Sequence, residues 1–123
     1  MGNTIDDGSA LALVEQWAEA FNNDVDRLID ELYAPDCTFL GVELGPERLR
    51  KFERRVLAAA PRRTARIERA HTAGDVVTVE GTLLDPDRGD DWHLPFCAVL
   101  TWREGKVVSD NTYADMSQWP GVH

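Results

Sequence analysis

The stretch that decides the fold is ALVEQWAEAFNNDVDRLIDELYAPDCTF, residues 12–39. Apolar residues recur at helical spacing on both sides of Asn22-Asn23-Asp24, which predicts two amphipathic helices separated by a break. Asp24 is placed to cap the second helix, and Pro35 is expected to end it. A short strand is predicted next, over residues 37–42. The two apolar stripes consist of Ala10, Leu13, Val14, Trp17, Ala18 and Phe21, then Val25, Leu28, Ile29 and Leu32.

The rest of the chain predicts one more helix and four more strands. Gly45-Pro46 suits the start of a helix, whose apolar positions continue at the same spacing up to Pro61. Runs of strand-forming residues follow as two hairpins, the second closed at Glu104-Gly105. This order predicts an α+β domain: a curved antiparallel sheet with three helices, all from the N-terminal half, packed on its concave face. The four strands are predicted at residues 64–72, 76–84, 92–102 and 107–115.

The length of 123 residues suits one domain, predicted over residues 9–116 between a flexible N-terminus (1–8) and a C-terminal tail (117–123). A net charge of -9 repels phosphate backbones and anionic lipid, so nucleic-acid and membrane partners are not expected. Neither a secretory signal nor a membrane-spanning run is evident. Cys37 and Cys97 stand far apart, which argues against a disulfide scaffold or a metal site. These features predict a cytoplasmic protein.

The quoted stretch, with GPERLRKF (residues 45–52) and LPFCAVLTWREGKVVSDNTYAD (residues 94–115), resembles the nuclear transport factor 2-like superfamily, in its SnoaL-like and ketosteroid isomerase-like branch. The resemblance covers about residues 10–115. It implies a cone-shaped α+β barrel with a deep apolar cavity, no cofactor, and commonly a homodimer. Members include isomerases, polyketide cyclases, epoxide hydrolases, dehydratases and binders without catalytic activity, so the resemblance implies a fold more than a reaction.

Two catalytic residue sets of the superfamily do not carry over to this chain. The positions that match the tyrosine and two aspartates of ketosteroid isomerases hold Trp17, Gly41 and Cys97, which supply neither the base nor comparable hydrogen-bond donors. The positions that match the catalytic residues of limonene epoxide hydrolases also hold other residue types. Neither reaction is therefore predicted. Those second positions are Phe39, Gly41, Glu80, Thr82 and Thr112.

Strand alternation gives a second route to the site. If the positions matching the epoxide hydrolases face the cavity, three titratable groups point inward: Asp110, Glu80 and His93. The turn at Glu104-Gly105 places the apolar Val99 opposite Asp110. Since loss of hydration raises the pKa of a carboxyl group, Asp110 is predicted as the proton-transfer residue, assisted by Glu80 or His93. The alternative is an offset of one residue, which would leave both carboxylates solvated, and a surface position is the ordinary expectation for His93.

Aromatic residues of the helices and the first strand are predicted to form the cavity wall, although such residues most often belong only to the core. Tyr33, with its hydroxyl, and Trp17, with its N–H, could also orient a ligand. Cys97 is expected to be a small buried apolar residue, because no histidine stands at a pairing position. The predicted ligand-binding residues are Trp17, Phe21, Tyr33, Phe39, Phe52, Thr82, Cys97 and Thr112.

These expectations favour one function and leave two alternatives. The first is a cofactor-independent isomerase, cyclase or lyase that uses general acid–base catalysis on an apolar carbonyl-bearing or polycyclic small molecule. The loss of both known catalytic sets favours a non-catalytic binder of a hydrophobic ligand or a partner. A weaker alternative is an epoxide hydrolase with a rearranged carboxylate pair. A homodimer is expected, because the predicted outer sheet face is too apolar for water. That face would carry Val77, Val79, Leu83, Phe96 and Leu100.

Overall fold

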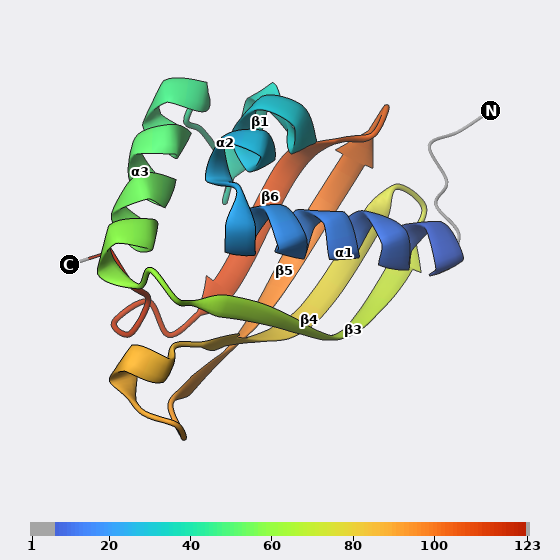
Figure 1. Cartoon of the computed structure of the whole chain (residues 1–123). Coiled ribbons are helices and arrows are strands. Elements are labelled where there is room, and N and C mark those ends of the chain that lie inside the picture. Colours follow the sequence, from blue (N-terminus) through green and yellow to red (C-terminus); the bar gives the residue numbers. More distant parts are fainter. Residues whose placement is uncertain (1–6, 123) are drawn as a thin grey trace.

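Within residues 7–122, three helical segments and two strands precede four long strands (Figure 1). The computed structural model describes residues 7–122, so the predicted flexible N-terminus lies mostly outside the described residues. The helices are α1 (Asp7–Asn23), α2 (Val25–Arg27), which continues as the π-helical turn η1 (Leu28–Leu32), and α3 (Pro46–Ala59). The strands are β1 (Tyr33–Phe39), β2 (Val42–Glu43), β3 (Thr64–Ala73), β4 (Val76–Leu84), β5 (His93–Arg103) and β6 (Lys106–Ala114), with the short 3₁₀ turn η2 (Pro86–Arg88) between β4 and β5.

One six-stranded sheet forms the body of the domain, in the order β2-β1-β6-β5-β4-β3. The strands from β3 to β6 pair antiparallel with their neighbours, whereas β1 pairs in parallel with β6. The sheet is curved, α1 lies across its concave side, and α3 stands along one end (Figure 1). This arrangement confirms the predicted α+β fold.

The inner side of α1 follows the apolar stripe predicted from the sequence. Ala10, Val14 and Trp17 are buried, and they belong to the same core as Leu28 and Ile29 of the next helical segment. Burial of a large apolar side chain stabilises a fold by roughly 1.5–3 kcal/mol relative to its exposure. The stripe therefore fixes which side of α1 meets the sheet and places Trp17 over the interior of the cone.

The segment predicted as one strand over residues 37–42 is a hairpin, so the predicted limits are wrong. β1 begins already at Tyr33 and turns at Leu40-Gly41 into β2. Both turn residues have a positive φ, of 50° and 82°, as tight hairpin turns often require. Gly41 adopts this conformation without strain because it has no Cβ. The early start of β1 places Tyr33 in the sheet, beside Val107 of β6.

A β-bulge in β6 changes which residues of β5 accompany Asp110. The pairing of β5 and β6 shifts by one residue near the hairpin turn, because Val108 is an extra residue in β6. Asp110 consequently lies opposite Leu100. An unbroken hairpin would instead place Val99 there, as the sequence led us to expect.

The predicted facing is right for β6 and wrong for β4 and β5. Asp110 and Thr112 lie on the concave side, but the residues of β4 and β5 on that side are the alternating apolar series rather than the polar one. The expectation that the outer face is apolar and must be covered by a second copy is therefore wrong. The five residues assigned to that face, Val77, Val79, Leu83, Phe96 and Leu100, are buried inside the cone.

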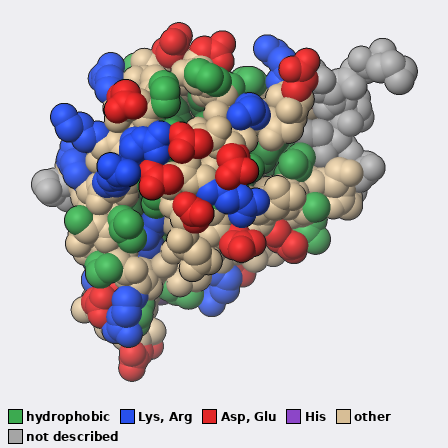
Figure 2. Space-filling model, turned by 45° about the horizontal axis from the view of Figure 1, so that its top comes forward, with side chains coloured by type: hydrophobic (Ala, Val, Ile, Leu, Met, Phe, Trp, Pro, Cys, Tyr) green, Lys and Arg blue, Asp and Glu red, His purple; other side chains and the backbone are tan. Residues whose placement is uncertain are grey.

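The surface is polar, and its charges are paired in several places. Lys and Arg side chains gather over the α3 side of the molecule, with acidic side chains beside them (Figure 2). Past β6, the predicted tail is held to the domain, since Pro120 is buried and Nη2 of Arg55 donates to the carbonyl oxygen of Gly121 at 2.7 Å. Within residues 7–122, no helix combines the length and apolarity needed to cross a bilayer.

Candidate functional site

An apolar pocket of about 200 Å³ opens inside the cone, between the sheet, α1 and α3. Seven of its fifteen lining residues are aromatic. Three more have polar side chains: the carboxyl groups of Glu53 and Asp110 and the hydroxyl group of Thr112. A concave apolar pocket with a few convergent polar groups is the usual form of a small-molecule site. The lining is Trp17, Phe21, Tyr33, Phe39, Leu40, Leu44, Leu49, Phe52, Glu53, Ala65, Phe96, Asp110, Thr112, Met116 and Trp119.

A chain of buried hydrogen bonds ends at the carboxylate of Asp110. Nε1 of Trp17 donates to the hydroxyl oxygen of Tyr33 at 2.9 Å, and that hydroxyl donates to Oδ2 of Asp110 at 2.6 Å. The hydroxyl of Thr112 donates to Oδ1 at 2.6 Å. Both carboxylate oxygens therefore accept a short hydrogen bond, and α1, β1 and β6 together fix the position of the group.

Two opposing effects act on the pKa of Asp110: burial favours the neutral carboxyl group, and hydrogen bonds favour the charged carboxylate. Burial, with only 5% of the residue exposed, raises the pKa of the carboxyl group, and the hydrogen bonds from Thr112 and Tyr33 offset part of that rise. The net direction is upward. The pKa of Tyr33 is also raised, by burial and by the nearby negative charge of Asp110, so Tyr33 stays a phenol that donates.

Glu53 is a second buried carboxyl group in the same pocket, and sequence reasoning missed it. It lies on α3, is 9% exposed, and its Oε2 has no hydrogen-bond partner among the described residues. Burial raises its pKa to about 7, Arg63 opposes that rise, and the charge of Asp110 adds to it. The sequence did carry a signal, because Glu53 stands four residues after Leu49 and three before Val56, within the apolar stripe of a basic helix.

Arg63 is a buried cation whose charge acts on Glu53, and only 2% of the residue is exposed. Its guanidinium lies over the ring of Phe21, 4.4 Å from the ring centroid, and donates through Nη2 to the carbonyl oxygen of Phe21. Nε and Nη1 have no partner within residues 7–122. Burial lowers the pKa of Arg63, and the charge of Glu53 counteracts this. The buried cation thus favours the charged form of Glu53.

The structure brings together most of the predicted site residues. Asp110 and Thr112 lie at the pocket, and the predicted aromatic residues form much of its wall. Their part in catalysis or binding stays a prediction. These aromatic residues are Trp17, Phe21, Tyr33, Phe39 and Phe52.

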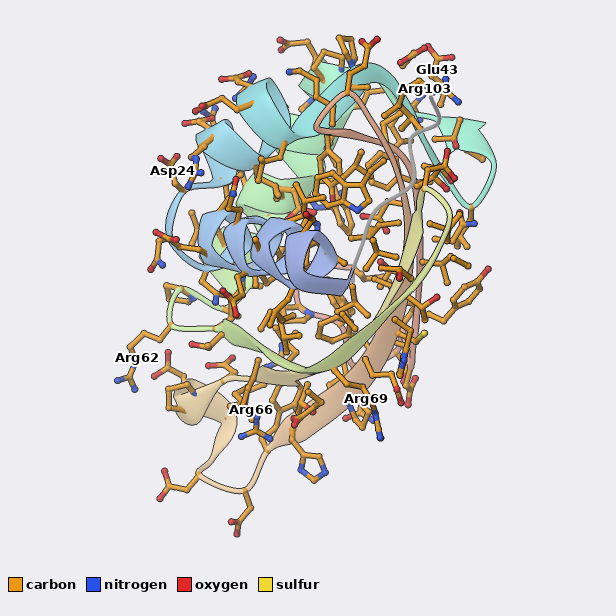
Figure 3. All side chains as sticks on the ribbon, turned by 90° about the vertical axis from the view of Figure 1, so that its right-hand side faces the viewer. Asp24, Glu43, Arg62, Arg66, Arg69 and Arg103 are labelled. Carbon is orange, nitrogen blue, oxygen red and sulfur yellow. The ribbon has the colours of Figure 1, made fainter. Side chains whose placement is uncertain are left out.

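Glu80, in contrast, lies on the outer face of the sheet, and its predicted inward position is wrong. Its Oε2 is 2.7 Å from Nε of Arg69 and 3.5 Å from Nε2 of His71, and 43% of its side chain is exposed. Figure 3 shows Arg69 pointing away from α1, on the outer side of β3. The reason is that β4 faces the opposite way from the prediction, so that Val79 and Gly81 lie on the concave side of the sheet.

The same reversal removes three further residues from the predicted site. Thr82 donates its hydroxyl to Oε1 of Glu68 on the outer face, at 3.1 Å. Cys97 is half-buried beside Glu80 on that face. His93 is exposed at the start of β5, with Nδ1 3.0 Å from the carbonyl oxygen of Asp91. None of the three lines the pocket. Within residues 7–122, no group of three or more His, Cys, Asp or Glu side chains is arranged to hold a metal ion.

A curved sheet closed by helices around an apolar pocket, with buried carboxyl groups at its inner wall, defines the class of nuclear transport factor 2-like α+β cones. The chain belongs to the SnoaL-like domain family, whose model matches residues 14–110.

Solved structures with the same fold are distant in sequence. Wild-type IdmH, a proposed polyketide cyclase from Streptomyces antibioticus, is 18% identical, covers 89% of this chain and 94% of its own, and gives a TM-score of 0.77. A hypothetical protein from Catenulispora acidiphila with a ketosteroid isomerase-like fold, solved with trimethylamine, is 26% identical over 87% and 88%, with a TM-score of 0.73.

A proposed polyketide cyclase from Acidithiobacillus ferrooxidans is 16% identical over 89% and 90%, with a TM-score of 0.77. Among curated proteins, none matches the chain.

Proposed function

We propose that the protein is a cofactor-independent enzyme that moves a proton on a small apolar carbonyl compound, with Asp110 as the proton-transfer residue. The observation that carries this proposal is the Asp110 carboxylate itself, buried at the wall of an apolar pocket and held by two short hydrogen bonds. A desolvated and fixed carboxylate is a stronger base toward a bound substrate than a hydrated one.

The two carboxyl groups divide the chemistry. Ionised Asp110 takes a proton from the carbon next to the substrate carbonyl, and the C–H electron pair moves into the enol system. Glu53, whose pKa of about 7 keeps a large fraction protonated near neutrality, donates a proton or hydrogen bond to the carbonyl oxygen. In a substrate whose enol is conjugated with a C=C bond, Asp110 returns the proton to the γ carbon and the enol oxygen returns its proton to Glu53, which completes an isomerisation. In a substrate with a second carbonyl group, attack of the enol carbon on that carbonyl forms a ring; the new alkoxide takes the proton from Asp110, and the enol oxygen returns its proton to Glu53.

The size of the pocket bounds the substrate. Its volume of about 200 Å³ lies below the roughly 300–1,000 Å³ that is common for ligand pockets. This favours a compound of one or two rings over a larger polycycle. The cyclisation branch is also supported by the similarity to IdmH and to the Acidithiobacillus protein, both proposed polyketide cyclases.

Exchange of substrate protons with D₂O tests the proposal whichever product the enzyme forms. Incubation with acetophenone, 1-indanone or 2-tetralone, followed by NMR of the proton next to the carbonyl, should show exchange faster than in buffer. Asp110→Asn should lower that rate about 100-fold or more, the usual scale for a general base. The control is Asp36→Asn, an exposed aspartate on β1, which should keep the full rate. Full activity of the Asp110 variant would refute the assignment.

A binder without catalysis is the second candidate, and one observation favours it. Both oxygens of Asp110 are already bonded to protein donors, as they would be in a purely structural network. In that case the same ketones would shift NMR signals of the pocket residues without any exchange above the buffer rate.

We also propose that the protein forms a homodimer through the outer face of its sheet. Cys97 and Val99 are half-buried there, and Tyr113 is 55% exposed, which leaves a modest apolar surface between polar side chains. The family resemblance supports the same assembly.

A further inference from the structure

Gly81 is the one position of the inner face of β4 between Val77 and Leu83 that has no side chain. Its backbone does not have a positive φ, so the residue is not required by a turn. A Cβ atom built at Gly81 would instead lie 2.5 Å from Cζ and 2.8 Å from Cε2 of Phe96. It would also lie 2.9 Å from the carbonyl oxygen of Arg66. Such distances are too short for any real contact, so a side chain here must displace the Phe96 ring and, by a smaller amount, the Arg66 carbonyl group.

The Phe96 ring is part of the pocket wall and is confined on its other sides. Gly81 and Phe96 are direct partners in the β4–β5 ladder, so the ring covers the glycine of the neighbouring strand. Its centroid is 6.3 Å from that of Trp17 and 6.2 Å from that of Trp119, the latter in an edge-to-face arrangement. All three rings line the pocket. A ring pushed away from Gly81 therefore moves toward the cavity and the two tryptophans.

We infer that Gly81 determines the largest ligand the pocket accepts, because its missing side chain lets Phe96 lie back against the sheet. This rests on the proposed function only in taking the pocket as the substrate site. With glycine, the pocket bounded by Phe96 accepts a flat compound of two fused rings. With alanine, the displaced ring would leave room for one ring only.

A pair of ketones that differ by one fused ring tests this inference. Acetophenone and 2-acetylnaphthalene are titrated into the wild-type protein and the Gly81→Ala variant, and binding is followed by NMR chemical shifts. The variant should bind 2-acetylnaphthalene about tenfold more weakly or worse, since pockets commonly discriminate by such factors against groups that do not fit. Binding of acetophenone should change much less. Equal losses for both ketones, or no loss for either, would overturn the inference.

The double variant Gly81→Ala, Phe96→Leu separates a pocket effect from a general loss of folding. The smaller leucine leaves space for the new Cβ, so the double variant should regain binding of 2-acetylnaphthalene. If Gly81→Ala does not fold, the double variant should still fold, because the Phe96 ring is the main obstacle. Equal failure of both variants would point to the Arg66 carbonyl instead and would refute the role of Phe96.

A crystal structure of the Gly81→Ala variant decides the matter independently of any ligand. The Phe96 ring should be displaced toward Trp17 or Trp119, with a smaller cavity; an unmoved ring and an unchanged cavity would overturn the inference. The outcomes stay distinct from those of the proposed function. If wild-type protein binds neither ketone, the proposed substrate class fails, while the ring position in the variant still tests the role of Gly81.

Discussion

Tyr33 links Trp17 to Asp110 through its hydroxyl group, which accepts one hydrogen bond and donates another. It receives the N–H of Trp17 and donates to Asp110. Tyr33→Phe would leave the Trp17 N–H and one oxygen of Asp110 unpaired in a buried place, which costs about 1–3 kcal/mol. Denaturant midpoints should show this loss. The control is Thr64→Val, which removes an exposed hydroxyl group at the start of β3 and should keep wild-type stability. Equal midpoints for both variants would contradict the buried network.

Glu53 should make the stability of the protein depend on pH. Its pKa is about 7 in the folded chain against 4.5 for an unperturbed glutamate, so the folded state holds this proton longer than the unfolded state. Stability should therefore fall as pH rises from about 4.5 to 7, and the fall attributable to Glu53 should level off above that window. A shift of this size corresponds to about 3 kcal/mol, taken as an order of magnitude.

Denaturant midpoints at pH 5 and pH 8 measure this dependence. Glu53→Gln should remove most of the fall, because the amide does not titrate. Glu47→Gln changes an exposed residue on the same helix and should leave the fall intact. The raised pKa of Asp110 adds a fall of the same sign, and that part should persist in both variants. A Glu53→Gln protein with the full wild-type pH dependence would rule out the buried, raised carboxyl group.

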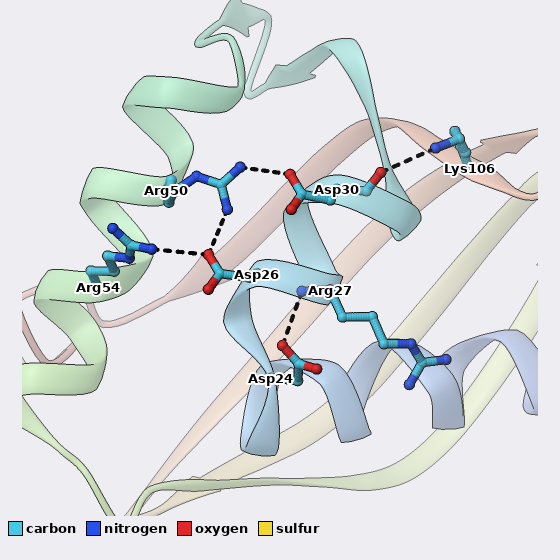
Figure 4. Close-up of polar contacts among 7 residues, drawn as sticks. All are labelled: Asp24, Asp26, Arg27, Asp30, Arg50, Arg54 and Lys106. Atoms are coloured by element: carbon cyan, nitrogen blue, oxygen red, sulfur yellow. Dashed lines mark hydrogen bonds and ion pairs between the residues drawn. The ribbon is translucent and has the colours of Figure 1, made fainter.

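Among the elements, α2 depends on a helix cap and on ion pairs with α3 (Figure 4). Oδ1 of Asp24 accepts from the backbone N–H of Arg27 at 3.1 Å, and loss of such a cap costs about 1 kcal/mol. Arg50 bridges Oδ1 of Asp26 at 2.5 Å and Oδ1 of Asp30 at 2.6 Å. Exposed ion pairs are screened by salt, whereas a cap hydrogen bond is screened much less.

The two contacts can be told apart by their salt dependence. Asp24→Ala should lower the denaturant midpoint by a similar amount at low and at high ionic strength. Arg50→Ala should have a smaller effect, and that effect should shrink further in about 1 M salt, where the screening length is only about 3 Å. A salt-independent loss for Arg50→Ala would mean that its packing, not its charge, stabilises the α2–α3 contact.

At the scale of the whole molecule, the outer face of the sheet is the interface of the proposed homodimer. The large apolar side chains of β4 and β5 lie inside the cone, so the proposed dimer relies on the smaller surface around Cys97, Val99 and Tyr113. Light scattering at micromolar concentration should give twice the chain mass of 13.8 kDa. Tyr113→Lys should dissociate the dimer without unfolding it, because a charge would be buried at the interface. A wild-type mass of one chain would exclude this assembly.

Much of the fold could be predicted from the sequence because its signals are local. Helical spacing of apolar residues marked the inner faces of α1 and η1, and Gly45-Pro46 marked the start of α3. The hairpin turns and the limits of β3 to β6 also followed from residues close in the chain. Asp110 was reached in this way, since alternation along β6 placed it on the same side as Thr112.

The composition of the site was decided only by the tertiary structure. Strand facing depends on the register between two segments, and one extra residue at Val108 replaced Val99 by Leu100 opposite Asp110. With Leu100 opposite Asp110, the ladder pairs place Gly81 and Phe96 on the inner face and Glu80 on the outer one. Glu53 shares the pocket with Asp110, which is 57 positions further along the chain, because α3 closes over the cone. The sequence determines the elements and their apolar faces through local spacing, whereas the register and closure of the sheet determine which polar groups share the pocket.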